Sequence, residues 1–68
     1  MKEHRLEKGI HYYAIFAIGQ YGGFVRGKLP YKMANTTEIN GYNFHKEFKT
    51  EDARNFYKEL VQNGFEKA

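Results

Sequence analysis

Basic and aromatic residues are interleaved in the middle of this sequence, a pattern suited to binding chemistry. Lys and Arg side chains neutralise phosphates, while Tyr and Phe rings pack on sugars or bases. Residues 26–49 hold five basic residues against two acidic ones, in a chain with a net charge of +3. A solvated face rich in lysine gives the same pattern, so charge alone does not decide between the two interpretations. The candidate nucleic-acid-binding residues are Arg26, Lys28, Tyr31, Lys32, Lys46 and Lys49.

The aromatic residues divide into two groups. Phe44 and Phe48 flank Lys46 in an alternating segment, and we interpret both as core residues. Tyr21 and Tyr31 lie in irregular segments and are better candidates for exposed contacts.

Residues suited to catalysis are scarce. The sequence has no cysteine and no serine, which excludes disulfides, cysteine zinc sites and the two commonest nucleophiles. The histidines His4, His11 and His45 are scattered without metal-ligand spacing. Residues 19–23 are glycine-rich but lack the Lys and the Ser or Thr of a phosphate loop, so a hairpin turn explains them better. We therefore expect no enzyme activity, no metal site and no cofactor.

Length and hydropathy limit the architecture. Sixty-eight residues make one domain, which we place at residues 9–68 behind a charged lead-in of residues 1–8. No apolar run approaches the ~20 residues of a membrane span, and the basic N-terminus lacks the apolar core of a signal peptide. These features predict a protein that stays in the cytoplasm.

Two strands are predicted in the first half of the chain. Residues 10–18 are apolar nearly throughout and rich in β-branched and aromatic types, which indicates a central strand buried on both faces. Residues 24–29 form a second strand after the glycine-rich turn. There, Phe24, Arg26 and Lys28 point to one side and Val25, Gly27 and Leu29 to the other.

A third strand and a helix are predicted in the second half. Pro30 ends the second strand, residues 35–38 resemble a single helical turn, and residues 42–48 alternate as a strand with one wet face. Tyr42, Phe44, Lys46 and Phe48 share one face of that strand.

The helix is the clearest predicted element. Thr50 is the expected N-cap, and Asn63-Gly64 is the expected stop, with Phe65 folding back on the last turn. The expected buried stripe comprises Ala53, Phe56, Tyr57, Leu60 and Val61.

These elements predict an α+β fold. It has a three-stranded antiparallel sheet with the C-terminal helix on one face and a short helical turn between strands 2 and 3. One helix covers only one face of such a sheet. The other face must be polar, covered by residues 31–41, or occupied by a partner.

A turn, a strand end and a helix start follow one another between residues 39 and 53. An apolar-x-Gly-aromatic turn (39–42) leads to a strand ending Lys-x-Phe-x-Thr (46–50), and an acidic pair and an alanine (51–53) open the helix. This order resembles the N-terminal domain of eukaryotic-type ribonuclease H, which binds RNA–DNA hybrid or double-stranded RNA. Residues 48–53 are equally similar to the N-terminal DNA-binding domain of tyrosine integrases.

The ribonuclease H resemblance covers residues 12–60 loosely and has specific implications. It implies that Lys46 contacts a phosphate and that Tyr31 lies near the family's tryptophan. The chain departs from the pattern because it has no Trp, and because Glu47 and His45 stand where the family has a lysine and an aromatic residue.

Two functions follow from these observations. The first is a small non-catalytic module that contacts a nucleic-acid duplex through the basic and aromatic residues of strands 2 and 3. The alternative is a small protein-binding module or inhibitor, of the kind that viruses and mobile elements encode, acting on a host protein through an exposed aromatic sheet face. Homodimerisation through that face is compatible with either function. A mimic of DNA is disfavoured, since the chain is basic.

Overall fold

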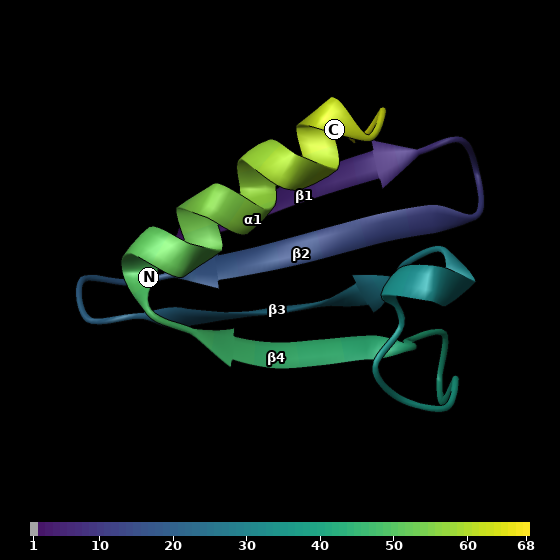
Figure 1. Cartoon of the computed structure of the whole chain (residues 1–68), viewed down its shortest axis with the longest axis horizontal. Helices are drawn as coiled ribbons and strands as arrows, with labels where there is room; N and C mark the ends of the chain where they lie inside the picture. Colours follow the sequence, from purple (N-terminus) through teal and green to yellow (C-terminus); the bar gives the residue numbers. More distant parts are fainter. Residues whose placement is uncertain (1) are drawn as a thin grey trace.

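The computed structural model describes residues 2–68; Met1, the first residue of the predicted lead-in, lies outside the described residues. Within this range the strands form one antiparallel sheet in the order β4-β3-β2-β1-β5, and the helix crosses one face of it (Figure 1). The elements are β1 (Lys2–Lys8), β2 (Tyr12–Ile18), β3 (Gly23–Lys28), the 3₁₀ helix η1 (Tyr31–Met33), β4 (Phe44–Phe48), α1 (Thr50–Gln62) and β5 (Glu66–Lys67).

The predicted α+β class is confirmed, but the prediction of a three-stranded sheet is wrong. The sheet has five strands among residues 2–68, because β1 and β5 add to one side of the three that were expected. The first predicted strand corresponds to β2 and is central, as expected, although it begins at Tyr12 rather than at residue 10. Ile10 lies in the preceding turn and is 93% exposed.

β1 occupies the segment that was expected to be a charged lead-in. All seven of its residues pair with β2, from Lys2 opposite Ile18 to Lys8 opposite Tyr12. The only buried side chain of this strand is Leu6, which lies over Ala14 in the core. Because the backbone supplies the ladder bonds, one apolar residue on the inner face is enough to fix the register. β1 was not predicted because most of its residues are charged and give no alternating apolar pattern.

β5 depends on the way the helix ends. The Phe65 N–H donates to the Leu60 carbonyl at 3.0 Å and the Gly64 N–H to the Val61 carbonyl at 3.1 Å, with Gly64 at φ +96°. This is a Schellman motif, and it reverses the chain so that Lys67 pairs opposite Leu6 of β1. Phe65 is buried there, which confirms the predicted stop and the return of its ring.

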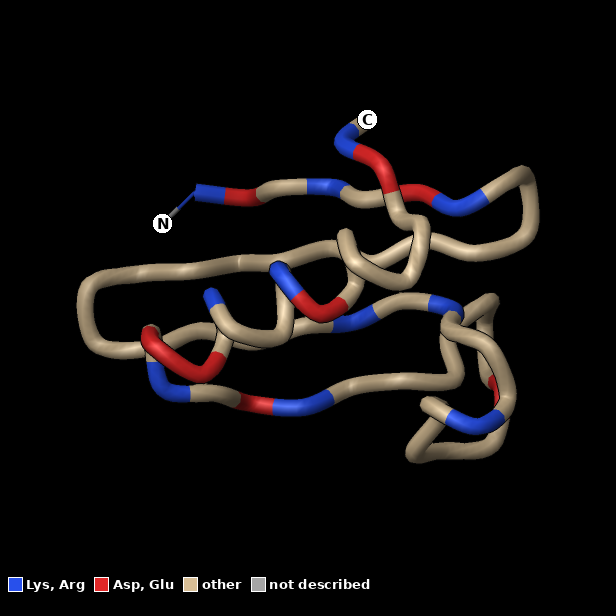
Figure 2. The backbone as a smooth tube through the Cα atoms, turned by 45° about the horizontal axis from the view of Figure 1, so that its top comes forward, with Lys and Arg blue, Asp and Glu red and all other residues tan. Residues whose placement is uncertain are grey.

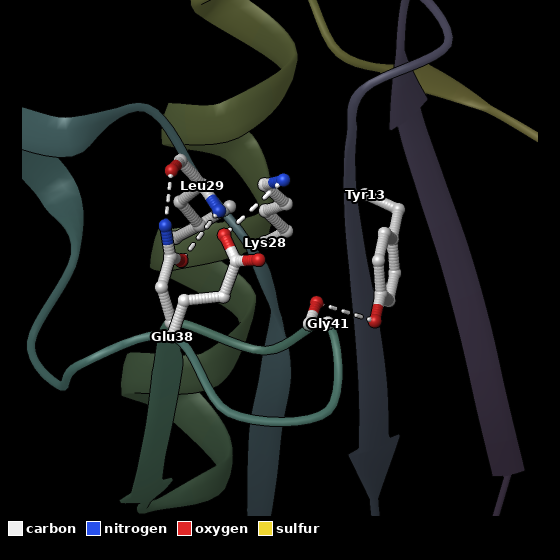
Figure 3. Close-up of polar contacts among 6 residues, drawn as sticks. Tyr13, Lys28, Leu29, Glu38 and Gly41 are labelled. Carbon is white, nitrogen blue, oxygen red and sulfur yellow. Dashed lines mark hydrogen bonds and ion pairs between the residues drawn. The ribbon is translucent and has the colours of Figure 1, made fainter.

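The segment between β3 and β4 differs from prediction in its short helix. The single turn is η1 at Tyr31–Met33, and residues 35–38 are not helical. Asn35 instead exchanges two side-chain hydrogen bonds with the His45 backbone, at 2.9 and 3.1 Å. Asn43 pairs with Leu29 in the same manner, at 2.8 Å each (Figure 3). Each asparagine side chain makes the pair of hydrogen bonds to a strand backbone that a neighbouring strand would make. These bonds join distant segments, so the local sequence did not predict them.

The core lies between the sheet and α1. Phe56 stacks against both Phe44 and Phe48, with 5.3 Å between ring centroids in each pair. The predicted helix stripe is confirmed except for Val61, which is 47% exposed because it lies beyond the edge of the packed face. Eight buried residues form the core: Leu6, Ala14, Phe16, Val25, Leu29, Phe44, Leu60 and Phe65.

Thr50 does not cap the helix as predicted. It is the first helical residue, and its hydroxyl donates to the Gly19 carbonyl at 3.1 Å and to the Gln20 carbonyl at 3.4 Å. Thr50 therefore ties the β2–β3 hairpin to the start of the helix. No helix among residues 2–68 is long and apolar enough to cross a membrane.

Candidate functional site

The structure distributes the six predicted binding residues over three places. Arg26 and Lys28 lie on the sheet face opposite α1, since they pair with Ile15 and Tyr13 of β2. Tyr31 and Lys32 lie in η1, at the far end of the molecule from the start of α1 (Figure 1). The other two candidates, Lys46 and Lys49, lie on the helix side of β4 and directly before α1.

The strand faces were predicted correctly for β3 and less well around β4. Val25 and Gly27 are buried under the helix, and Phe24 lies on the opposite face. Tyr42 was expected to share a face with Phe44, but its ring contacts the open-face residues Tyr13 and Arg26. The Ile39–Tyr42 bridge causes this difference, because it turns residue 42 out of the β4 ladder.

The open sheet face is covered by stacked aromatic and basic side chains. The Arg5 guanidinium lies 4.6 Å from the Tyr13 ring centroid, and that ring is 6.0 Å from the Tyr42 ring. Arg26 lies between Tyr42 and Phe24, at 5.5 and 5.9 Å from their centroids. Within the described residues, the Arg26 Nε is buried without a hydrogen-bond partner. These cations are therefore held by rings.

Ion pairs and a hydrogen bond complete this layer. Lys28 Nζ contacts Glu38 at 3.2 Å, and the Tyr13 hydroxyl donates to the Gly41 carbonyl at 3.0 Å (Figure 3). Arg5 pairs with Glu7 at 3.2 Å. Burial raises the pKa of Tyr13, and the neighbouring Tyr42 raises it further, while the nearby arginines act in the opposite direction.

The charge of the open face does not favour phosphate. Glu3 and Glu7 of β1, Glu47 of β4 and Glu38 of the preceding loop outnumber the basic residues Arg5, Arg26 and Lys28 on this side. Two of the three cations are already paired. The aromatic character predicted for this face is present, but its basic residues already contact aromatic rings and carboxylates of the same face.

A groove on the helix side has the opposite electrostatic character. It measures about 630 Å³ and runs between α1, the start of β1 and the end of β2. Four basic side chains and no acidic one line it among residues 2–68. Figure 2 shows basic positions in blue near both ends of the chain and on the helix. The lining residues are Lys2, His4, Ile18, Gly19, Gln20, Arg54, Tyr57, Lys58 and Lys67.

Three elements place the four cations. Lys2 lies on the helix-side face of β1, two residues from His4 and opposite Ile18. Lys67 pairs opposite Leu6 and so lies on the same face. Arg54 and Lys58 are four residues apart, about one turn or ~6 Å along the helix. The floor between them holds His4 and Tyr57, whose rings meet edge to face at 6.4 Å.

The groove cations lack counter-charges. The two ion pairs found among residues 2–68 both lie elsewhere, at Arg5 and Lys28. Arg54 and Lys58 also repel each other, since like charges at i and i+4 destabilise a helix by a few tenths of a kcal/mol. The four cations are exposed, whereas His4 and Tyr57 are half-buried. Such a cluster attracts anions, and its side chains are free to donate hydrogen bonds to them.

Lys46 and Lys49 line a second hollow, on the other side of the helix. There they are accompanied by the acidic residues Asp52 and Glu59 of α1, which offset their charge. No group of three or more His, Cys, Asp and Glu residues among residues 2–68 is arranged to hold a metal ion.

The sequence analysis missed the groove because its cations come from both ends of the chain. Residues 51–68 carry more acidic than basic residues, so they looked unsuited to phosphate. Two signals were available. Lys2 and His4 are spaced for one face of a strand, and Arg54, Tyr57 and Lys58 for one face of a helix.

Comparisons of this chain with protein-family models, with curated protein sequences and with solved structures find no match.

Proposed function

We propose that this domain is a small non-catalytic nucleic-acid-binding module. Its main contact with the sugar–phosphate backbone is the groove that Lys2, Arg54, Lys58 and Lys67 line. The observation that carries the proposal is the set of four exposed, unpaired cations with no acidic residue among them. A local excess of cations on one surface is the electrostatic footprint of a protein that binds phosphates.

The shape of the groove supports a polymer rather than a small anion. Its four cations come from three elements, and two of them lie about one turn apart on α1. A single phosphate needs only one or two donors, whereas successive phosphates engage a row of them. The chain has no cysteine, which fits a reducing compartment, and we place this activity in the cytoplasm.

The salt dependence of binding tests the proposal. Labelled RNA–DNA hybrid, duplex DNA, duplex RNA and single strands are titrated at several salt concentrations. Four phosphate contacts give a log–log slope of about −3.6 on a duplex or about −2.8 on a single strand. The double variant Arg54→Gln, Lys58→Gln reduces the magnitude of that slope by about two.

A matched variant controls for total charge. Lys46→Gln, Lys49→Gln removes the same two charges from the hollow on the other side of α1. We expect its slope to stay close to that of the unmodified protein. Equal losses from the two variants would place binding outside the groove, and no salt-dependent binding at all would refute the function.

A second candidate function is protein binding through the open sheet face. The half-exposed rings of Tyr13, Phe24 and Tyr42, on a side without a helix, favour it. In that case one partner, or a second copy of the chain, co-purifies in a fixed ratio and protects these rings. Variants of the groove then leave the complex intact.

A further inference from the structure

The tip of the β2–β3 hairpin carries an exposed aromatic ring directly after two residues that line the cationic groove. Gly19 and Gln20 line the groove, and Tyr21 follows them directly with 91% of its surface exposed. We propose that Tyr21 and the groove form one site for single-stranded nucleic acid. A base stacks on the Tyr21 ring while the adjoining phosphates lie among Lys2, Arg54 and Lys58. This inference rests on the proposed function and names its substrate class.

The hairpin tip is held in place before any ligand arrives. The Gly19 N–H donates to the Gly22 carbonyl at 2.8 Å, which closes the turn. The Thr50 hydroxyl donates to the Gly19 and Gln20 carbonyls, so the tip is attached to the first residue of α1. Arg54 lies one helical turn further along. The ring and the cations are thus joined through short, fixed connections, which reduces the entropy lost when a ligand orders them.

The conformation of the hairpin turn requires glycine at position 22. The φ of Gly22 is +147°, and a Cβ at this position would lie 2.9 Å from the Phe48 carbonyl oxygen. Only glycine fits such a position without a shift of the backbone. The sequence around Tyr21 therefore fixes the turn and leaves the ring outside the core.

The ring of Tyr21 makes none of the aromatic or cation–π contacts that other tyrosines make within residues 2–68. Tyr31 is just as exposed, at 94%, but it lies in η1 at the other end of the molecule (Figure 1). Tyr21 lines a small hollow that includes Glu47 and shares Gly19 and Gln20 with the groove, whereas the hollow beside Tyr31 contains Lys32 and Glu38 and shares no residue with the groove. Tyr31 is therefore an internal control for an exposed tyrosine.

Stacking on one ring favours a single strand over a duplex. A base in a duplex has both faces covered by its neighbours, whereas an unpaired base offers a free face to an aromatic side chain. A duplex gains only the phosphate contacts of the groove. We therefore expect preference for single strands, in place of the duplex preference that the sequence suggested.

The experiment measures fluorescence anisotropy of labelled oligonucleotides: a single strand of DNA, one of RNA, a duplex, and a single strand with abasic sites. Tyr21→Ala weakens binding to the base-containing single strands roughly 5- to 150-fold, the range for one stacked base. Binding to the duplex and to the abasic strand is unchanged, because neither offers a base to the ring. Tyr21→Phe keeps the affinity, and Tyr31→Ala behaves as the unmodified protein.

Each outcome has a separate meaning. If Tyr21→Ala leaves single-strand affinity unchanged, or weakens single strand and duplex equally, the stacking inference is wrong while the groove proposal stands. If the unmodified protein binds no nucleic acid, both fail. A circular dichroism spectrum and melting curve of Tyr21→Ala confirm that the fold is retained. The DNA and RNA strands show whether the 2′-hydroxyl contributes.

Discussion

The two faces of this small sheet use the same residue types for different purposes. On the open face, Arg5 and Arg26 lie against aromatic rings, and Lys28 pairs with Glu38. In the helix-side groove, the cations have neither a ring nor a carboxylate as partner among residues 2–68. A basic residue that is already satisfied contributes to stability, whereas one without a partner is available to a ligand. Whether a surface is available to an anionic ligand therefore depends on what each cation contacts and not on how many cations the surface has.

The largest expected effect is a loss of nucleic-acid affinity when charges are reversed in the groove but not on the open face. Lys2→Glu, Lys67→Glu should weaken nucleic-acid binding roughly 100-fold at low salt, because two charge-assisted contacts worth about 1.5 kcal/mol each are lost. The matched reversal Arg5→Glu, Lys28→Glu makes the same change of charge on the open face. It should alter affinity by less than about threefold while lowering the melting temperature. Anisotropy titrations and melting curves measure both quantities, and a larger binding loss from the open-face variant would contradict the assignment.

The next largest effect is a change in the free energy of unfolding when Arg26 is replaced. Arg26→Ala removes its contacts with Phe24 and Tyr42 and should lower the free energy of unfolding by about 1–2 kcal/mol. Arg26→Met keeps an apolar side chain between the rings and removes the buried Nε that lacks a partner. It should therefore be as stable as the unmodified protein, or more so. Urea denaturation of both variants measures this difference. If Arg26→Met were as unstable as Arg26→Ala, the charge itself would be stabilising.

Elements with a strong local signal were predictable from the sequence. The helix stop at Gly64, the hairpin before β3 and the two faces of β3 follow from glycine positions and from alternation. β1 was not predictable from the sequence, because a strand with a single buried residue, Leu6, has almost no periodic pattern of apolar residues. Its existence depends on the unpaired edge of β2, which is a tertiary property.

The candidate site was predicted less well than the fold, for a related reason. The residues on one surface come from β1, α1 and β5, and the pairing of β1 with β5 brings the two ends of the chain together. A count of charge along the chain averages Arg54 and Lys58 with the acidic residues Glu51, Asp52 and Glu59 of the same helix. The sequence predicted a basic surface on the strands that correspond to β3 and β4, whereas the cations of the groove come from β1, α1 and β5.

A smaller effect tests how the loop before β4 is held to the open face. Tyr13→Phe removes the hydrogen bond to the Gly41 carbonyl and should cost about 1 kcal/mol of stability. The Tyr42 and Arg5 contacts with the ring remain in this variant. Nucleic-acid affinity should be unchanged, since the groove lies on the other side of the sheet. Urea denaturation and one anisotropy titration measure the two expectations, and a loss of affinity would show that the faces are coupled.

The smallest effect is a dependence on alkaline pH that also belongs to the open face alone. Burial, with help from Tyr42, raises the pKa of the Tyr13 phenol in the folded state above its ordinary value of 10.0. The fold therefore favours the neutral phenol. Its contribution to stability is complete below the unfolded pKa and is lost as pH rises through the folded pKa.

Comparison of the unmodified protein with Tyr13→Phe isolates this contribution, because the two proteins differ only in the Tyr13 hydroxyl. The free energy of unfolding is measured by urea denaturation below and above the ordinary tyrosine pKa. The difference in stability between the two proteins should narrow as pH rises through the Tyr13 transition, because the phenolate is poorly accommodated beside Tyr42. A difference that stays constant would show that the Tyr13 hydroxyl is as well solvated in the fold as in the unfolded chain. The open face would then be a less closed layer than its stacked rings indicate.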